Sequence, residues 1–391
     1  MFAPVLVLLL PWACALALTP LVIRWATRRG LLDHPTARKA HSSPVPLLGG
    51  VGVLASIAIG LALVVLQIGP LDDSALLISI GLGAFAMLGL GVCDDVYDVA
   101  PRWKLAGQVA IAAATWFAGI RVGAVDLPFG IAVPASEFLS LVITVCWLVL
   151  ITNAFNLIDG MDGLATGVAV IAALTMYLLA AEHGGQTVPV LVGLALAGAL
   201  AGFLRFNLPP ARIFLGDGGA LFVGYVIGVL AIASMQKNPT AMVLAVPLLA
   251  AGVPLLDTLL SIARRVASQF RQRGVAGLRP AQIARAVATA DRGHLHHLLL
   301  RGGWNERHTL FALYAISAGL ALVALWTRRM SPDLRWGVFV GVLVCGYLAQ
   351  RSLEARAVRR ESLEAARMGS MAARLDPGRG PSPATATTPS P

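Results

Sequence analysis

Four polar clusters stand at or near the ends of long apolar segments, and they hold the residues best suited to chemistry. They cover residues 94–98 (DDVYD), 156–163 (NLIDGMDG), 214–217 (FLGD) and 294–297 (HLHH). A carboxylate beside lipid hydrocarbon is costly, so it is kept there mainly where it pairs, binds a metal or takes part in a reaction. The clusters are therefore candidates for a functional site.

Three aspartates within five residues form the first cluster. Asp94, Asp95 and Asp98 can bind a divalent cation through oxygen ligands. Alternatively, one of them can act as a base while another holds a metal or a positive group. A solvated helix end is the simpler interpretation, which a single aspartate would favour more than three do.

The second cluster continues a pattern with a polar residue at every third position. Asn153, Asn156, Asp159 and Asp162 would face the same way on a helical turn and form a polar stripe that leaves an apolar helix. The glycines that follow the two aspartates allow a ligand to approach the backbone closely. A turn rich in Asp and Gly is the alternative.

The last two clusters suggest a metal and a phosphate. Asp217 lies in a glycine-rich run and suits Mg²⁺, which prefers few protein carboxylates together with substrate phosphates; a charge that reaches the membrane interface is the alternative. His294, His296 and His297 lack the partners of a zinc site, and the nearby Arg292 favours phosphate over metal. A solvated loop is the alternative for the histidines.

A basic loop at residues 34–41, which includes Lys39, precedes the second apolar segment. A solvated loop is the simpler interpretation of any one of its positive residues. As a group they can attract a phosphorylated substrate.

The composition identifies a polytopic membrane protein. Of 391 residues, 57% are hydrophobic and 13% are charged, whereas a soluble domain carries about 25% charged residues. The four cysteines show neither metal-ligand spacing nor a disulfide framework. The net charge of +10 indicates orientation in the membrane and contact with anionic lipid headgroups, and no basic stripe with interleaved aromatics points to nucleic acid.

Membrane helices must position the clusters, so we expect an all-α fold with about eleven transmembrane segments. An N-terminus outside the cell places 25 of the 30 Lys and Arg residues on the cytoplasmic side, as the positive-inside rule requires, and it places the C-terminus there too. All four clusters then fall on the cytoplasmic side. The expected segments are 3–23, 47–69, 74–93, 104–120, 137–155, 163–181, 187–204, 213–234, 241–262, 308–326 and 335–350.

The expected organisation is a transmembrane catalytic domain at 1–350 and a basic cytoplasmic tail at 351–391. The largest cytoplasmic loop is 263–307, in which 281–290 resembles a short surface helix. The tail has helix-forming composition to about residue 374 and a disordered, Pro-rich end. No internal repeat supports a transporter built from inverted halves, which is a remote alternative.

Metal-binding carboxylates and cationic phosphate binders on one membrane face suit phosphoryl transfer, in which positioning and charge neutralisation supply most of the catalysis. The lipid boundary suggests that one substrate is a lipid. The chain also resembles the polyprenyl-phosphate N-acetylhexosamine-1-phosphate transferase family. The matching motifs are RKAH at 38–41 with PLLGG at 46–50, DDVYD at 94–98, NAFNLIDGMDGL at 153–164, FN at 206–207 with FLGD at 214–217, and HLHH at 294–297.

The resemblance implies ten or eleven helices around a cytoplasmic cleft, in which a sugar 1-phosphate passes from a UDP-sugar to a polyprenyl phosphate and UMP is released. It implies Mg²⁺, or Mn²⁺ in its place. It makes Asp94 the base or activator of the lipid phosphate, and Asp95 a second catalytic residue that supports the metal and the phosphate. It makes Asp217 the main metal ligand, aided by Asn156. The residues that it assigns to substrate are Asp159, Asp162, Asn207 and Phe214 for the nucleotide, His294, His296, His297 and Arg292 for the sugar phosphate, and Lys39 and Asn153 as further candidates.

The histidine motif resembles that of the GlcNAc-type branch of this family, because Asp-Arg precedes it and it reads His-x-His-His. This resemblance implies UDP-GlcNAc and undecaprenyl phosphate as substrates, membrane lipids as surroundings, a homodimer, and the bacterial inner membrane as location. Gly293 stands where that branch often has Pro. Transfer of phospho-MurNAc-pentapeptide or of another N-acetylhexosamine 1-phosphate is the alternative.

Overall fold

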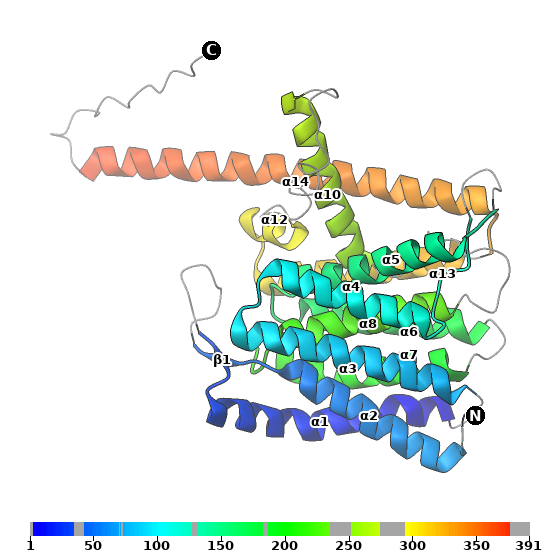
Figure 1. Ribbon diagram of the computed structural model, residues 1–391. Helices are drawn as coiled ribbons and strands as arrows, with labels where there is room; N and C mark the ends of the chain where they lie inside the picture. The colour runs from blue at the N-terminus through cyan, green and yellow to red at the C-terminus, as the bar shows by residue number, and fades with distance from the viewer. Residues whose placement is uncertain are drawn as a thin grey trace.

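The computed structural model describes residues 3–34, 43–69, 71, 73–126, 132–182, 187–234, 252–273, 294–327 and 329–375. This part of the chain is almost entirely helical, as predicted (Figure 1). Its helices are α1 (Ala3–Arg29), α2 (Gly49–Ile68), α3 (Ser74–Tyr97), α4 (Pro101–Phe117), α5 (Glu137–Ile158), α6 (Leu164–Glu182), α7 (Thr187–Asn207), α8 (Gly216–Ala233), α10 (Gly252–Arg273), α12 (Leu295–Arg301), α13 (Glu306–Thr327) and α14 (Pro332–Leu375). Two antiparallel ribbons connect them, β1 (Leu32–Asp33) with β2 (Val45–Pro46) and β3 (Ala124–Asp126) with β4 (Ala132–Pro134).

Nine helices among the described residues are long and apolar enough to cross a membrane, which confirms a polytopic membrane protein. Two of the eleven expected segments are not among them. The segment at 104–120 forms α4, which has 17 residues and carries Lys104 in its first turn. Half of the segment at 241–262 lies outside the described residues, which resume at α10, and the other half forms the short apolar start of that helix.

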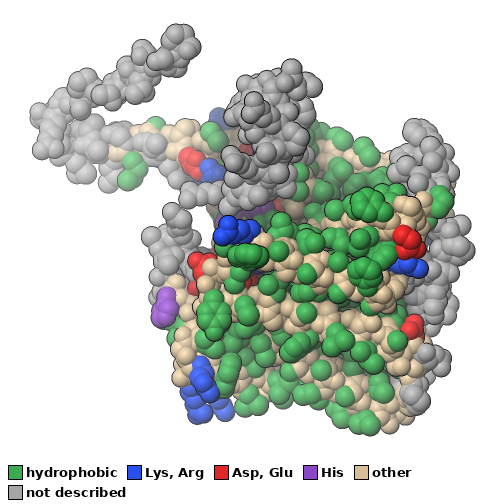
Figure 2. Space-filling view, in the orientation of Figure 1, with side chains coloured by type: hydrophobic (Ala, Val, Ile, Leu, Met, Phe, Trp, Pro, Cys, Tyr) green, Lys and Arg blue, Asp and Glu red, His purple; other side chains and the backbone are tan. Residues whose placement is uncertain are grey.

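Helix α8 lies at the centre of the bundle, and nearly all of its residues are buried. It packs against α3 and α5, while α7 packs against α1 and α6. The outer helices expose large apolar side chains such as Leu82 and Phe85, and the face in Figure 2 is broadly apolar. Exposed apolar surface of this extent suits contact with lipid, because the hydrocarbon chains take the place of a protein neighbour.

Paired glycines bring α2 and α3 unusually close to α8. A Cβ atom at Gly91 would lie 2.5 Å from the Cα atom of Gly218, and one at Gly50 would lie 2.3 Å from that of Gly219. Small residues of this kind let helix backbones touch within a membrane. As a result, the end of α3 that carries the acidic cluster lies directly beside the start of α8.

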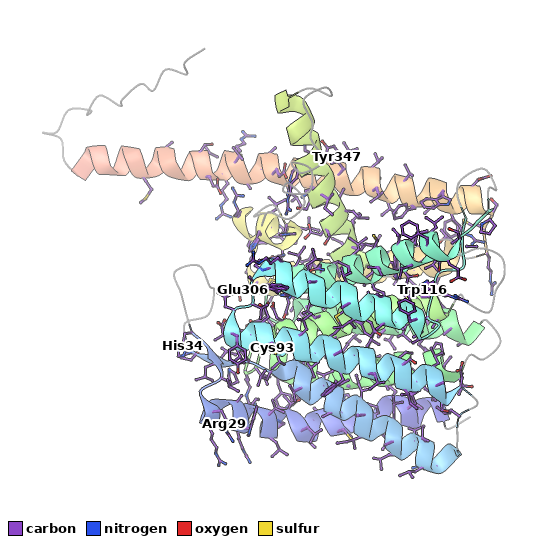
Figure 3. All side chains as sticks on the ribbon, viewed as in Figure 1. Arg29, His34, Cys93, Trp116, Glu306 and Tyr347 are labelled. Atoms are coloured by element: carbon purple, nitrogen blue, oxygen red, sulfur yellow. The ribbon has the colours of Figure 1, made fainter. Side chains whose placement is uncertain are left out.

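The four clusters gather at one end of the bundle, which we call the site end. It contains the last turns of α3 and α5, the first turn of α8, and α12, and it lies opposite the N-terminus in Figure 1. Arg29, at the end of α1, lies at this end as well (Figure 3). The expectation that the clusters share one face of the protein is therefore confirmed, and their cytoplasmic location stays a prediction.

Two helices extend the site end. Helix α14 has 44 residues and continues through residue 351 as one helix, so the expected helical start of the tail is confirmed and no element ends at the expected domain boundary. Helix α10 continues into the expected 263–307 loop and runs across the direction of its neighbours (Figure 1). The expected surface helix at 281–290 lies outside the described residues.

Candidate active site

Three oxygen-bearing side chains from three helices converge on the ammonium group of Lys104. The Nζ atom donates to Asp94 Oδ2 at 2.7 Å and to Asn156 Oδ1 at 3.3 Å, and it also forms an ion pair with Asp217. Asn156 completes the group by donating from Nδ2 to Asp217 Oδ1 at 3.0 Å. Residues from α3, α4, α5 and α8 thus form one cluster, which we call the central cluster.

The turn between α3 and α4 aims Lys104 at Asp94. Asp98 adopts a left-handed conformation with φ of 50°, so the chain reverses direction there, and Pro101 then begins α4. Asp94 Oδ1 accepts a hydrogen bond from Val99 N at 2.9 Å, which fixes the carboxylate against this turn. One oxygen of Asp94 is therefore bound to the turn, and the other accepts from the ammonium group of Lys104.

Asp95 is directed at α8. Its Oδ1 accepts from Asp217 N at 2.9 Å and its Oδ2 accepts from Gly218 N at 3.1 Å. The first N–H groups of a helix have no partner within the helix, and a carboxylate there also interacts favourably with the helix dipole. Both oxygens of this predicted catalytic residue therefore hold the helix start that carries Asp217.

The central cluster has the donor set of a hard cation. Two carboxylates, Asp94 and Asp217, and the amide oxygen of Asn156 surround a position that the ammonium group of Lys104 takes here. The described residues contain no group of three or more His, Cys, Asp or Glu side chains that could hold a metal. Few carboxylates with an amide oxygen fit Mg²⁺, whose coordination is usually completed by water and substrate phosphate.

The predicted polar stripe on α5 is wrong, because the helix ends at Ile158. Asp162 lies in the turn that follows, where its Oδ2 accepts from Ala211 N at 2.8 Å. Asp159, at the C-cap of α5, is partly buried. Burial raises the pKa of Asp159 well above its usual range, and the nearby carboxylates of Asp217, Asp95 and Asp162 raise it further.

Asn153 faces a different partner from Asn156. It donates from Nδ2 to Gln108 Oε1 at 2.7 Å, which joins α5 to the buried Gln108 of α4. Both side chains line a cavity of about 300 Å³ together with Asp94 and Lys104. The predicted substrate-binding role of Asn153 is thus compatible with its position next to the central cluster.

Asn207 is the last residue of α7, and Phe214 lies in the loop that leads from there into α8. Asn207 is buried; its Oδ1 accepts from Thr166 Oγ1 at 2.7 Å and its Nδ2 donates to Ile213 O at 2.9 Å. Phe214 is half-buried, and its backbone pairs with Pro46 and Gly49. Asn207 therefore stabilises the conformation of this loop through both ends of its amide, and its expected place in the nucleotide pocket stays a prediction.

The histidine cluster lies beside the turn that contains Asp159. A Cβ atom at Gly160 would lie 3.3 Å from His296 Nε2, and this nitrogen is buried without a hydrogen-bond partner. Burial lowers the pKa of His296 to about 3, with further lowering by His297 and His294, so the ring is neutral at physiological pH. A neutral imidazole with one unpaired nitrogen can accept or donate a hydrogen bond to a substrate.

Two predicted residues, Lys39 and Arg292, lie outside the described residues. Three residues that contact the predicted ones were not themselves predicted: Lys104, Gln108 and Asp257. The carboxylate of Asp257 lies 2.8 Å from His294. A sequence signal existed for two of them. Lys104 opens one expected apolar segment and Asp257 interrupts another, and an ionisable group within such a segment is a functional candidate by default.

Comparison with known sequences decides the family. The sequence model of glycosyl transferase family 4 matches residues 77–235, which include the whole central cluster. A Bacillus subtilis relative named "probable undecaprenyl-phosphate N-acetylglucosaminyl 1-phosphate transferase" is 31% identical over 79% of this chain and 81% of its own length. The chain belongs to glycosyl transferase family 4.

The names of two further relatives include a different lipid acceptor and a different sugar. A decaprenyl-phosphate N-acetylglucosaminephosphotransferase of Mycolicibacterium smegmatis is 30% identical over 78% of this chain and 78% of its own length. A phospho-N-acetylmuramoyl-pentapeptide-transferase of Moorella thermoacetica is 33% identical over 75% of this chain and 87% of its own length. The resemblance predicted from the motifs is thereby confirmed.

Proposed function

We propose that the protein transfers GlcNAc 1-phosphate from UDP-GlcNAc to undecaprenyl phosphate at the cytoplasmic face of the bacterial inner membrane. An oxygen of the lipid phosphate attacks the β-phosphorus of the nucleotide sugar. The bond between this phosphorus and the bridging oxygen breaks, and UMP leaves. The product is a lipid-linked sugar that can start a cell-envelope glycan.

The observation that carries this proposal is the convergence of Asp94, Asp217 and Asn156 on one cation position at the site end. Phosphoryl transfer needs little covalent help from the protein and depends on positioning and charge neutralisation. Asp217 and Asn156, with Asp94 beside them, would hold Mg²⁺ or Mn²⁺. When bound, the ion would offset the negative charge of the pyrophosphate.

The cavity beside Asp94 supports a lipid phosphate as acceptor. It is lined by the end of α3 and by α4 and α5, and it contains both the polar pair Gln108–Asn153 and the cation of Lys104. Lys104 would attract the acceptor phosphate, and Asp94 would orient it or take its proton. The turn that contains Asp159 and Asp162, together with the adjacent histidine cluster, would bind the nucleotide sugar.

The choice of sugar rests on the His-x-His-His motif and on the names of relatives, of which the Bacillus and Mycolicibacterium proteins carry N-acetylglucosamine. The Moorella relative gives the second candidate, phospho-MurNAc-pentapeptide. The two differ in the bulk attached to the sugar, so a substrate panel separates them.

The test combines purified protein, undecaprenyl phosphate and Mg²⁺ with UDP-GlcNAc, UDP-GalNAc or UDP-MurNAc-pentapeptide, and it measures UMP and sugar-labelled lipid. We expect equimolar UMP and labelled lipid with UDP-GlcNAc, and neither with the Asp217→Asn variant. If labelled lipid forms only with UDP-MurNAc-pentapeptide, the transferred group in the proposal changes from GlcNAc 1-phosphate to phospho-MurNAc-pentapeptide. Movement of a substrate across vesicles without UMP would overturn it in favour of transport.

A further inference from the structure

A buried carboxylate that the proposed reaction does not use lies behind the histidine cluster. Asp257, on α10, is 3% exposed and directs both oxygens at the start of α12. Its Oδ2 lies 2.8 Å from His294 Nδ1, and its Oδ1 accepts from Leu295 N at 2.9 Å. A buried carboxylate is costly unless such partners compensate it, so this contact is a specific feature of the fold.

The pairing decides which nitrogen of His294 carries a proton. An ionised carboxylate only accepts hydrogen bonds, so Nδ1 is the donor, and in the neutral ring Nε2 is then an acceptor. Carboxylates that hold the far nitrogen of an imidazole are a common means of fixing both its tautomer and its orientation. Asp257 therefore sets the plane and the protonation pattern of His294.

The orientation of His294 also affects His296 and the turn that contains Asp159 and Asp162. The rings of His294 and His296 are stacked, with centroids 6.1 Å apart and an interplanar angle of 12°. His296 in turn places its unpartnered Nε2 against Gly160. A change in the ring plane of His294, or in the start of α12, would shift this nitrogen with it.

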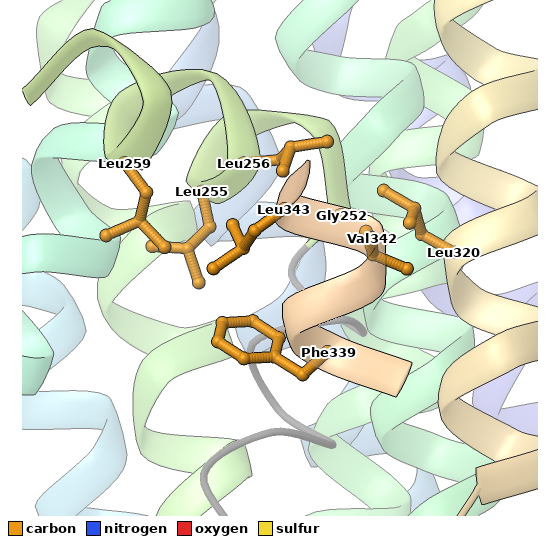
Figure 4. A pocket seen from close by; sticks show the side chains of 8 residues that line it. All are labelled: Gly252, Leu255, Leu256, Leu259, Leu320, Phe339, Val342 and Leu343. Carbon is orange, nitrogen blue, oxygen red and sulfur yellow. The ribbon is translucent and has the colours of Figure 1, made fainter. Parts of the chain in front are cut away.

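Helix α10 is itself held firmly. Leu255, Leu256 and Leu259 pack with residues of α13 and α14 around the small apolar pocket in Figure 4. At the next turn, Arg264 forms an ion pair with Glu354 of α14 at 2.6 Å. Asp257 thus connects the histidine cluster to a packed helix outside the central cluster.

We infer that Asp257 is a positioning residue: it orients His294 and the first turn of α12 so that the histidine cluster meets the nucleotide sugar. This inference rests on the proposed function for the identity of that ligand, and the contact itself does not depend on it. Asp257 is not expected to touch substrate. Its removal should affect use of the donor more than use of the lipid acceptor.

The informative variant is Asp257→Asn, which keeps the size of the side chain and an oxygen for Leu295 N. Its amide would present N–H to His294 Nδ1 and thereby force the opposite tautomer. We expect the KM for the UDP-sugar to rise, or kcat/KM for it to fall, by roughly 10- to 100-fold, the range seen for outer partners of histidine ligands. The KM for the polyprenyl phosphate should stay unchanged.

A spectroscopic measurement separates this inference from the proposed function. In protein labelled with ¹⁵N-histidine, the nitrogen shifts of His294 should report an Nδ1-protonated ring in the wild type and a changed tautomer in Asp257→Asn. The signal is assigned with a His294→Gln variant. The His294 signal can be measured even if no UDP-sugar releases UMP. That result would reject the proposed function but not the inference about Asp257.

Glu354→Gln is the matched control, because it removes the charge from another contact of α10, the ion pair with Arg264. We expect it to leave the donor KM and the His294 signal at wild-type values. The inference is overturned if Asp257→Asn keeps both the wild-type tautomer and the wild-type donor kinetics. It is also overturned if both variants lower thermal stability and activity alike while the His294 signal stays unchanged, since Asp257 would then only stabilise the fold.

Discussion

The carboxylate of Asp95, at the end of α3, accepts hydrogen bonds from the backbone N–H groups of Asp217 and Gly218 at the start of α8. Adjacent aspartates consequently have different partners. Asp94 faces the cation of Lys104, whereas Asp95 holds the helix that presents Asp217. A pair that looks like one motif in the sequence thus has two separate sets of contacts.

The first prediction compares Asp94→Asn with Asp95→Asn. Asp94→Asn should lower kcat by about 100-fold or more, the usual contribution of a positioned acid or base, with little change in the thermal unfolding midpoint. Asp95→Asn keeps only one acceptor for two N–H groups and should also destabilise the protein, by about 0.5–2 kcal/mol, as loss of a helix cap does. UMP release and thermal unfolding in detergent measure the two effects. Equal stability of both variants would contradict this division of roles.

Part of this arrangement was predictable from the sequence. Ionisable groups at the ends of apolar segments identify Asp94, Asp159, Asp217 and the histidines as a site at one end of a bundle, because burial in lipid penalises a charge that serves no purpose. The attachment of Asp95 to the start of α8 was not predictable. It depends on a contact between Gly91 and Gly218, which are far apart in the chain.

The residues whose contacts the sequence did not indicate have partners on other helices or in later segments. Asn207 stands in a matching motif, but its amide is satisfied by Thr166 and Ile213. Lys104 was included in an expected membrane segment, and only the fold shows that its ammonium group reaches α5 and α8. Spacing along one helix cannot reveal such contacts, because it describes neighbours on that helix alone.

The second prediction concerns Lys104, whose cation separates Asp94 from Asp217. Lys104→Gln should lower kcat by about 100-fold, comparable with the loss of one electrostatic group in an active site. It also leaves more negative charge around the metal position, so the Mg²⁺ concentration for half-maximal residual activity should fall. Titration of UMP release with Mg²⁺ measures both. Arg102→Gln, on the same turn of α4 but exposed, is the control and should behave as wild type.

The third prediction tests the close approach of α3 to α8. Gly91→Ala adds a methyl group 2.5 Å from the Cα atom of Gly218, so the helices must separate. We expect a loss of about 1–3 kcal/mol in stability, the cost of overpacking, together with lower activity as Asp95 moves away from Asp217. Thermal unfolding and UMP release are the measurements.

Gly89→Ala provides the matched control for this prediction. It lies on the same helix, and its added Cβ would meet nothing within 4 Å. The same substitution without the contact should leave activity unchanged. A similar loss in both variants would show that helix flexibility, and not the contact with α8, is what the glycine supplies.

The last prediction follows from the neutral ring of His296. Its pKa is about 3 in the folded protein and about 6.5 in an unfolded chain, so between these values the unfolded state binds a proton that the folded state does not. The stability supplied by the neutral form is therefore complete above about pH 6.5 and falls as the pH drops toward 3. The unfolding midpoint of the wild type should decrease between about pH 7 and about pH 5.

His296→Gln, which cannot titrate, should show a weaker decrease, whereas His308→Gln at an exposed position should keep the wild-type slope. Parallel slopes for the wild type and His296→Gln would mean that the ring is charged in the folded protein, and His296 would then bind a phosphate as a cation.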